Sequence, residues 1–249
     1  MTDPVAADRH RERIAAERRQ GEVVAAGAED AWGWLSPAGR IRADRRARFI
    51  AASCGLGPEI SVLELGCGTG EFSARLVETG CALTAVDISE ATAAICRRRL
   101  GDRAKIVVGD IERDPGVEGP FDAIVGVSVL HHVDLDACLD ATFSHLRSGG
   151  HFAFSEPNMR NPQVWAERHI GVVAKLRKVT PHETAFRVDE LRARLERAGL
   201  AVTTCEPYEF LHPATPRVAI GAVMALERLA IATPLRAIAG SILVAGRRP

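Results

Sequence analysis

The chain has 249 residues, which is long enough for one large domain or two small ones with a sizeable core. Its 32 basic and 32 acidic side chains balance, so no net charge attracts it to nucleic acid or to an anionic membrane. Its six cysteines are scattered without a CxxC pair, so their spacing indicates neither a zinc site nor a disulfide framework.

Two helix-prone segments come first in the chain. Residues 5–31 are charged and helix-prone, residues 32–39 (WGWLSPAG) are a break, and residues 41–55 predict a second helix. The N-terminus is polar and rich in arginine and has no apolar signal core, so we expect a cytoplasmic protein.

Short apolar runs and helical patterns then alternate. The predicted strands are residues 60–65, 82–87, 104–110, 121–130 and 151–157, and the predicted helices are residues 71–80, 88–101 and 135–150. Ser89 is the expected N-cap of the second of these helices, and Gly101 its end. Such alternation implies parallel strand pairing, so the sequence predicts an α/β fold with a doubly wound sheet.

A glycine-rich turn follows the first strand, in the sequence VLELGCGTGEFS at residues 62–73. A turn of this kind between a strand and a helix lets backbone approach a ligand closely. The glycines Gly66, Gly68 and Gly70 depart from the dinucleotide pattern, because Glu71 stands where its third glycine would be. Glu64 at the strand end would repel a pyrophosphate and suits a ligand with a cationic end. The alternative is a plain tight turn.

Carboxylates also close the next two strands. Asp87 stands where it can accept hydrogen bonds from both hydroxyls of a ribose, and Asp110 where an adenine amino group can donate. The alternatives are a helix cap for Asp87 and a turn residue for Asp110. Cys67 lies between two glycines, and we expect it to be inert.

These motifs resemble those of the class I S-adenosylmethionine-dependent methyltransferases. The segments LELGCGTG, AVDIS, GDI, FDAIVGVSVLHHV and LRSGGHFAFSEPN follow the family's order, and the resemblance covers roughly residues 60–206. The chain is most similar in style to small-molecule enzymes of the ubiquinone-biosynthesis O-methyltransferase type. The resemblance implies a seven-stranded, mostly parallel sheet with the last strand antiparallel, and the last two strands near residues 200–207 and 241–247.

The resemblance also implies domain limits and a cofactor site. Residues 1–55 would form an N-terminal helical lid, and residues 56–249 the methyltransferase domain with helical cap insertions at about 157–185 and 208–238. S-adenosylmethionine is the implied cofactor, S-adenosylhomocysteine its product, and no metal is expected. The expected cofactor-binding residues are Arg42, Arg46, Glu64, Gly66, Cys67, Gly68, Gly70, Asp87, Ile88, Asp110, Ile111 and Val127. Arg42 or Arg46 would meet the methionine carboxylate, unless both lie on a solvated helix face.

Candidate catalytic residues lie at the carboxyl edge of the sheet, where open α/β sheets bind ligands. A neutral imidazole of His132 or His131 can take the proton of a hydroxyl acceptor, and Glu156 can orient a histidine or the acceptor. Alternatively, the histidines shape the turn and Glu156 is a solvated loop carboxylate. The expected substrate-binding residues are Trp32, Trp34, Asn158 and Tyr208.

The sequence therefore predicts methyl transfer to a small molecule, most simply to a hydroxyl oxygen and in secondary metabolism. The alternatives are N- or C-methyl transfer, a non-catalytic cofactor-binding protein, and a nicotinamide oxidoreductase. No nucleic-acid partner is expected, because GVSVLHHV lacks the Asn/Asp-Pro-Pro-Tyr segment of enzymes that methylate bases. The apolar stretch 216–235 contains Glu227, Arg228 and Pro234, so a transmembrane span is not expected. It would pack as a cap or in a homodimer, or touch a membrane surface.

Overall fold

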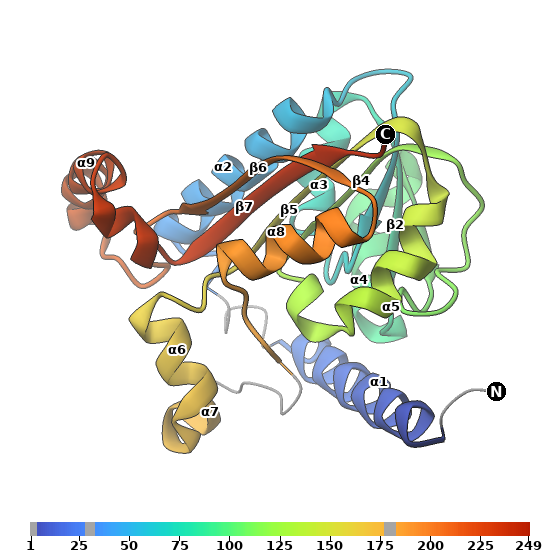
Figure 1. The fold of residues 1–249 in the computed structure, drawn as a ribbon, viewed down its shortest axis with the longest axis horizontal. Coiled ribbons are helices and arrows are strands. Elements are labelled where there is room, and N and C mark those ends of the chain that lie inside the picture. Colours follow the sequence, from blue (N-terminus) through green and yellow to red (C-terminus); the bar gives the residue numbers. More distant parts are fainter. Residues whose placement is uncertain (1–3, 28–32, 177–182) are drawn as a thin grey trace.

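In the computed structural model, residues 4–27, 33–176 and 183–249 are described, and they form a seven-stranded sheet with helices on both faces (Figure 1). The strand order is β3-β2-β1-β4-β5-β7-β6. Neighbouring strands run parallel from β3 to β5, and β7 pairs antiparallel with both β5 and β6. The strands are β1 (Ser61–Leu65), β2 (Ala82–Asp87), β3 (Ala104–Val108), β4 (Phe121–Val127), β5 (Leu146–Pro157), β6 (Ala201–Tyr208) and β7 (Ser241–Arg247). The predicted fold class and the two predicted C-terminal strands are confirmed.

The inner strands β1, β4 and β7 are buried on both faces, and their successive side chains point to opposite sides of the sheet. Leu63, Ile124 and Phe152 pack on one side against α5 (Leu135–Thr142) and α8 (Val188–Arg197). Alternate strand residues pack on the other side against α2 (Pro37–Cys54), α3 (Ser73–Leu76) and α4 (Glu90–Leu100). One of the two helices of the predicted N-terminal lid, α2, therefore contributes to the core. The division into lid and domain stays a prediction.

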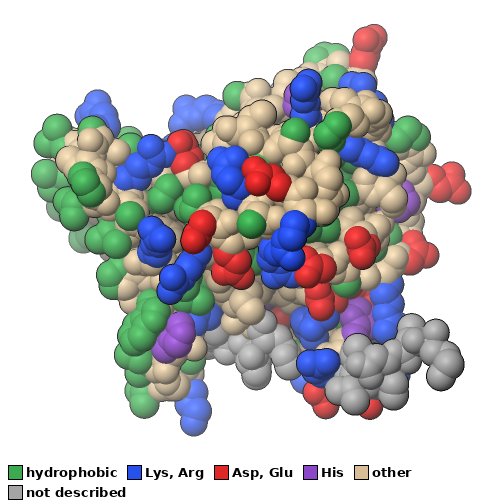
Figure 2. All heavy atoms as spheres, viewed as in Figure 1, with side chains coloured by type: hydrophobic (Ala, Val, Ile, Leu, Met, Phe, Trp, Pro, Cys, Tyr) green, Lys and Arg blue, Asp and Glu red, His purple; other side chains and the backbone are tan. Residues whose placement is uncertain are grey.

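Three helical segments lie outside these layers. Helix α1 (Pro4–Ala25) lies along the sheet edge at which β1 to β4 end, and α6 (Pro162–His169) with α7 (Gly171–Leu176) lies below the sheet (Figure 1). Helix α9 (Ile220–Ile231) lies at one end of the molecule, where apolar side chains gather on the surface (Figure 2). None of the described helices is long and apolar enough to cross a membrane.

Among the strands, two predicted boundaries are wrong by three residues or more. Strand β4 ends at Val127 rather than at residue 130, because Ser128 has φ 54° and the chain then enters a 3-10 turn, η4 (Leu130–His132). Strand β5 begins at Leu146, within the predicted helix 135–150. Leu146 is fully buried and pairs with β4, so tertiary burial there decides in favour of a strand.

Candidate active site

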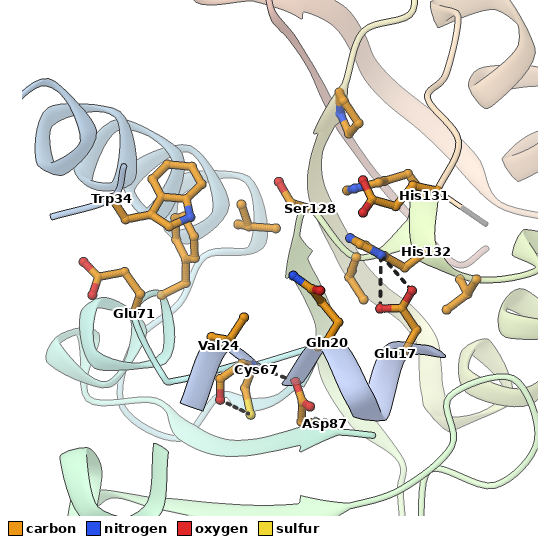
Figure 3. Close-up of a pocket in the computed structure, with 18 of the residues that line it drawn as sticks. Glu17, Gln20, Val24, Trp34, Cys67, Glu71, Asp87, Ser128, His131 and His132 are labelled. Atoms are coloured by element: carbon orange, nitrogen blue, oxygen red, sulfur yellow. Dashed lines mark hydrogen bonds and ion pairs between the residues drawn. The ribbon is translucent and has the colours of Figure 1, made fainter. Parts of the chain in front are cut away.

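A cavity of about 810 Å³ opens where the parallel strands end, between the glycine turn and helices α1 and α2 (Figure 3). Its volume is within the range of roughly 300–1,000 Å³ that is typical of small-molecule sites. Of the cofactor-binding and catalytic residues proposed from the sequence, twelve line it, namely Arg42, Arg46, Gly66, Cys67, Gly68, Asp87, Ile88, Asp110, Ile111, Val127, His131 and His132. Trp34 lines it as well.

The three glycines of the turn all have left-handed backbone, with φ 67° at Gly66, 52° at Gly68 and 83° at Gly70. A Cβ atom at Gly66 would lie 2.5 Å from Val129 Cγ2, and one at Gly70 would lie 2.8 Å from Cys96 Sγ. These two glycines are therefore required by packing as well. A Cβ at Gly68 would meet no atom within 4 Å, so the backbone there is open toward a ligand. Gly70 does not line the cavity.

Asp87 ends β2 and holds the glycine turn to helix α4. One carboxylate oxygen accepts the N–H of Gly68 at 2.7 Å, and the other accepts the N–H of Ser89 and the hydroxyl of Thr92, both at 2.9 Å. Burial raises the pKa of Asp87, and these hydrogen bonds oppose that rise. A carboxylate has about four acceptor positions, so three bonds leave one for a ribose hydroxyl. The predicted contact with both hydroxyls stays a prediction.

Asp110 follows β3 and already has a partner in helix α1. His10 Nε2 lies 2.8 Å from Asp110 Oδ2, and Asp110 Oδ1 accepts the N–H of Glu112 at 3.0 Å. Ile111 beside it lines the cavity and is buried. An apolar wall next to a carboxylate suits an adenine ring with its amino group, so these residues fit the predicted role.

Glu64 lies on β1 but does not reach the cavity wall. It is 2% exposed and accepts a hydrogen bond from the hydroxyl of Ser73. Burial raises the pKa of Glu64 from 4.5 to about 8, so the buried side chain favours its neutral form. The structure therefore places Glu64 beneath the glycine turn, and the expected contact with the cationic end of the ligand stays a prediction.

This raised pKa predicts a pH effect on stability. Between about pH 4.5 and pH 8 the unfolded chain loses the proton of Glu64 while the folded chain keeps it, so stability falls as pH rises through this window. Glu64→Gln removes the titrating carboxyl group and with it this dependence of stability on pH. Relative to wild type, the free energy of unfolding of the variant should increase by roughly 2–4 kcal/mol between pH 5 and pH 8. Urea unfolding of both proteins without cofactor measures it, and a difference that does not change with pH would refute it.

Three arginines of α2 pair with two buried carboxylates, of which Glu209 lines the cavity. Arg42 Nε and Arg46 Nη2 both lie 2.7 Å from Glu209 Oε2, and Arg45 forms an ion pair with Glu227 of α9. Burial lowers the pKa of Arg46 to about 10, so it stays charged at neutral pH. Arg46 Nη1 is buried and has no hydrogen-bond partner among the described residues. The surplus positive charge and this unused donor fit the carboxylate of a methionine moiety.

His131 is held from behind by Glu156. Its Nδ1 lies 2.7 Å from Glu156 Oε2, while Glu156 Oε1 accepts the backbone N–H groups of Val129 and Leu130, each at 3.0 Å. Burial lowers the pKa of His131, and the neighbouring His132 lowers it further, against the bond to Glu156. Glu156 is buried and does not line the cavity, so its geometry is that of a residue that orients a histidine.

His132 lies beside His131 and is held by helix α1. The two rings have centroids 4.1 Å apart, and His132 Nδ1 lies 3.2 Å from Glu17 Oε2 (Figure 3). Burial acts to lower the pKa of His132, but the hydrogen bond and charge of Glu17, together with the charges of Glu183 and Glu156, outweigh burial and raise it. Because carboxylates accept from Nδ1–H in both histidines, Nε2 of each neutral ring is left as an acceptor.

One group of described side chains has the composition of a metal site. The group consists of His131, His132 and Glu183. Each offers one ring nitrogen or carboxylate oxygen, and these three atoms lie within 4.8 Å of one another. Glu183 also lies 2.9 Å from Arg168 Nη2, and this ion pair weakens its carboxylate as a ligand. The expectation of a metal-free site stays a prediction.

The residues proposed for the substrate are dispersed. Trp34 lines the cavity and packs edge-on against Phe72, whereas Trp32 lies outside the described residues. Asn158 is fully buried, and its amide donates to the backbone carbonyls of the segment before β7, so it anchors that segment. Tyr208 does not line the cavity, and its ring packs under the guanidinium of Arg45.

Sequence reasoning missed the side of the cavity that helix α1 forms. Arg13, Glu17, Gln20 and Val24 all line it. Their spacing of three or four residues places them on one face of a helix, and this was the signal available in the sequence. Because the segment is rich in charged residues on all sides, this face could not be distinguished from a solvent-exposed one.

Comparisons with known proteins agree with this architecture. Residues 62–150 match the methyltransferase domain family. An uncharacterized methyltransferase of Geobacillus sp. (strain WCH70) is 31% identical over 42% of this chain, and the chain spans only 50% of that relative's length. A ubiquinone biosynthesis O-methyltransferase of Pseudomonas fluorescens is 30% identical over 63% of this chain and 71% of its own length.

Solved structures share the fold. The N-methyltransferase NodS of Bradyrhizobium japonicum, in complex with S-adenosylhomocysteine, has a TM-score of 0.63 and 18% identity and covers 94% of this chain and 98% of its own. The putative methyltransferase in a complex with the Haloferax volcanii Trm112 activator has a TM-score of 0.67 and 20% identity, with coverages of 92% and 97%.

The sheet order, the glycine turn and the acidic strand ends define a class of nucleoside-cofactor-binding α/β proteins. Together with these relatives they show that the chain belongs to the class I S-adenosylmethionine-dependent methyltransferases. S-adenosylmethionine is the cofactor of this family, and the open backbone at Gly68 and the unused donor of Arg46 fit it.

Proposed function

We propose that the protein transfers a methyl group from S-adenosylmethionine to a hydroxyl oxygen of a small molecule, in secondary metabolism. The observation that carries this proposal is His132 in the cavity wall, with Nδ1 held by Glu17 and Nε2 left as an acceptor. A hydroxyl acceptor has to lose a proton as the methyl group arrives, and a positioned imidazole is suited to take it.

The chain's residues supply binding and alignment. When bound, S-adenosylmethionine supplies a methyl group already activated by a sulfonium. Asp87 and the backbone at Gly68 would hold the ribose and the turn-facing part of the ligand, and Arg46 its carboxylate. His132 Nε2 takes the acceptor proton, and its basicity is supported by Glu17. Alignment of the reacting groups can lower the barrier by several kcal/mol, and by roughly 7–11 kcal/mol in well-oriented intramolecular reactions.

A methyl-transfer assay tests the proposal. Isotope-labelled S-adenosylmethionine would be incubated with the protein and with matched aromatic acceptors that differ only in carrying a hydroxyl, an amine or a blocked oxygen. We expect label on the hydroxyl oxygen, located by mass spectrometry, and none on the blocked compound. Label on the amine alone would contradict the choice of oxygen.

A second candidate, N-methyl transfer, is favoured by the acidic character of the cavity near the histidines. Glu17, Glu167 and Glu183 all line this part of the cavity, and carboxylates of this kind attract an ammonium group. His132 would then remove the proton that an ammonium acceptor must lose before it can react. Similarity to the N-methyltransferase NodS and to ubiquinone biosynthesis O-methyltransferases supports the scaffold in either case.

A further inference from the structure

We propose that Glu17 is a positioning residue for His132, and that helix α1 thereby makes the proton acceptor competent only while it is docked over the cofactor cavity. The consequence for turnover rests on the proposed function, whereas the contact between the two side chains does not. Glu17 belongs to α1 and His132 to the turn after β4, and 115 residues separate them in the chain.

Helix α1 is attached to the site at two further points. His10 bridges Asp110 and Glu112 at 2.8 Å and 3.2 Å, and Arg13 Nε donates to Glu112 at 2.8 Å. These contacts join the N-terminal half of α1 to the loop that follows β3. The loop includes Asp110 of the predicted adenine pocket, so helix α1 contacts a residue that would also bind the cofactor.

The second attachment is at Gly21, which lies against the N-terminus of α4. A Cβ atom at Gly21 would lie 2.3 Å from Ser89 Oγ, so only glycine permits this approach. Ser89 follows Asp87, the predicted ribose ligand, by two residues. The helix is thus fixed beside β3 and beside β2, and Glu17 lies between these attachments, so docking of α1 determines where its carboxylate stands.

Several charged groups surround His132, and Glu17 forms a hydrogen bond with its ring. Its neighbours are Glu17 from α1, Glu183 from the segment before α8, Glu156 from β5 and the ring of His131. Glu156 is bonded to His131, and Glu183 is paired with Arg168. A bond from Nδ1–H to Glu17 fixes the tautomer that leaves Nε2 unprotonated.

Glu17→Gln keeps the size of the side chain and removes its charge, and Glu22→Gln on the exposed side of the same helix is the matched control. In Glu17→Gln we expect the pKa of His132, followed by NMR titration of the imidazole, to fall, because burial is then less strongly opposed. We also expect kcat on the pH plateau to fall roughly 10-fold, since the base is retained but is less well oriented. The acid limb of the rate profile should move to lower pH. S-adenosylhomocysteine affinity should change less than twofold, which is about 0.4 kcal/mol.

His10→Ala tests whether the effect travels through the helix, because it removes an attachment of α1 and leaves Glu17 in place. A fall in the His132 pKa in this variant supports the proposal, and an unchanged pKa overturns the part assigned to docking. An unchanged His132 titration in Glu17→Gln overturns the proposal outright. Failure of the proposed function would look different, because the titration would then shift while no acceptor was methylated. Circular dichroism of each variant shows that the fold is intact.

Discussion

Replacing His132 by alanine should lower kcat by roughly 10²–10⁴-fold while the affinity for S-adenosylhomocysteine stays near wild type. The reason is that the variant keeps the glycine turn and Asp87 but has no group to take the acceptor proton. His151→Ala is a matched control, because His151 lies exposed on β5 and away from the cavity. Single-turnover kinetics with a hydroxyl acceptor, beside calorimetry of S-adenosylhomocysteine binding, measure both quantities.

The pH profile separates this role from a structural one. The neutral imidazole is the active form, so the wild-type rate should rise with pH through a His132 pKa that lies above the ordinary histidine value of 6.5. The rising limb should vanish in His132→Ala. His131→Asn retains a donor for Glu156 and should keep the limb. Near-normal turnover of His132→Ala with the limb intact would end the assignment and point to ionisation of the acceptor itself.

Asp87→Ala should weaken S-adenosylhomocysteine binding by about 1–3 kcal/mol, because a charge-assisted hydrogen bond to the ribose is lost. The structure adds a second reason, since Asp87 also holds the N–H of Gly68 and the hydroxyl of Thr92. Thr92→Val removes one of these scaffold bonds and leaves the carboxylate, so its smaller effect on affinity measures the scaffold alone. Asp140→Ala on the exposed surface of α5 is the control for charge. Unchanged affinity in Asp87→Ala would remove this residue from the cofactor site.

The fold could be predicted because its signals are local. Each strand is a short apolar run, each helix has its own period and caps, and the glycine turn follows directly after its strand. The errors arose at Ser128 and Leu146, where a left-handed backbone and a buried contact with the neighbouring strand override the local pattern. Such contacts depend on residues elsewhere in the chain, so they do not appear in the local hydrophobic pattern of the sequence.

Several residues of the cavity lining could be predicted for the same reason, whereas the long-range pairs that hold its charged side chains could not. Asp87 and Gly68 lie at strand ends, whose position follows from the sheet. The pairing of Glu17 with His132, and that of Glu209 with Arg42, join side chains 115 and 167 residues apart. The sequence shows which side chains are charged, but it does not show which of them pair. The pairing depends on how the helices that carry these side chains pack in the folded protein.

A crystal structure of the protein with S-adenosylhomocysteine tests the central claim most directly. We expect the ligand in the 810 Å³ cavity, with its ribose at Asp87, its carboxylate at Arg46 Nη1 and its sulfur directed at the space in front of His132. The contact between Glu17 and His132 should be present over the bound ligand. Binding at another place, or a sulfur directed away from His132, would contradict the assignment of this cavity as the site of methyl transfer.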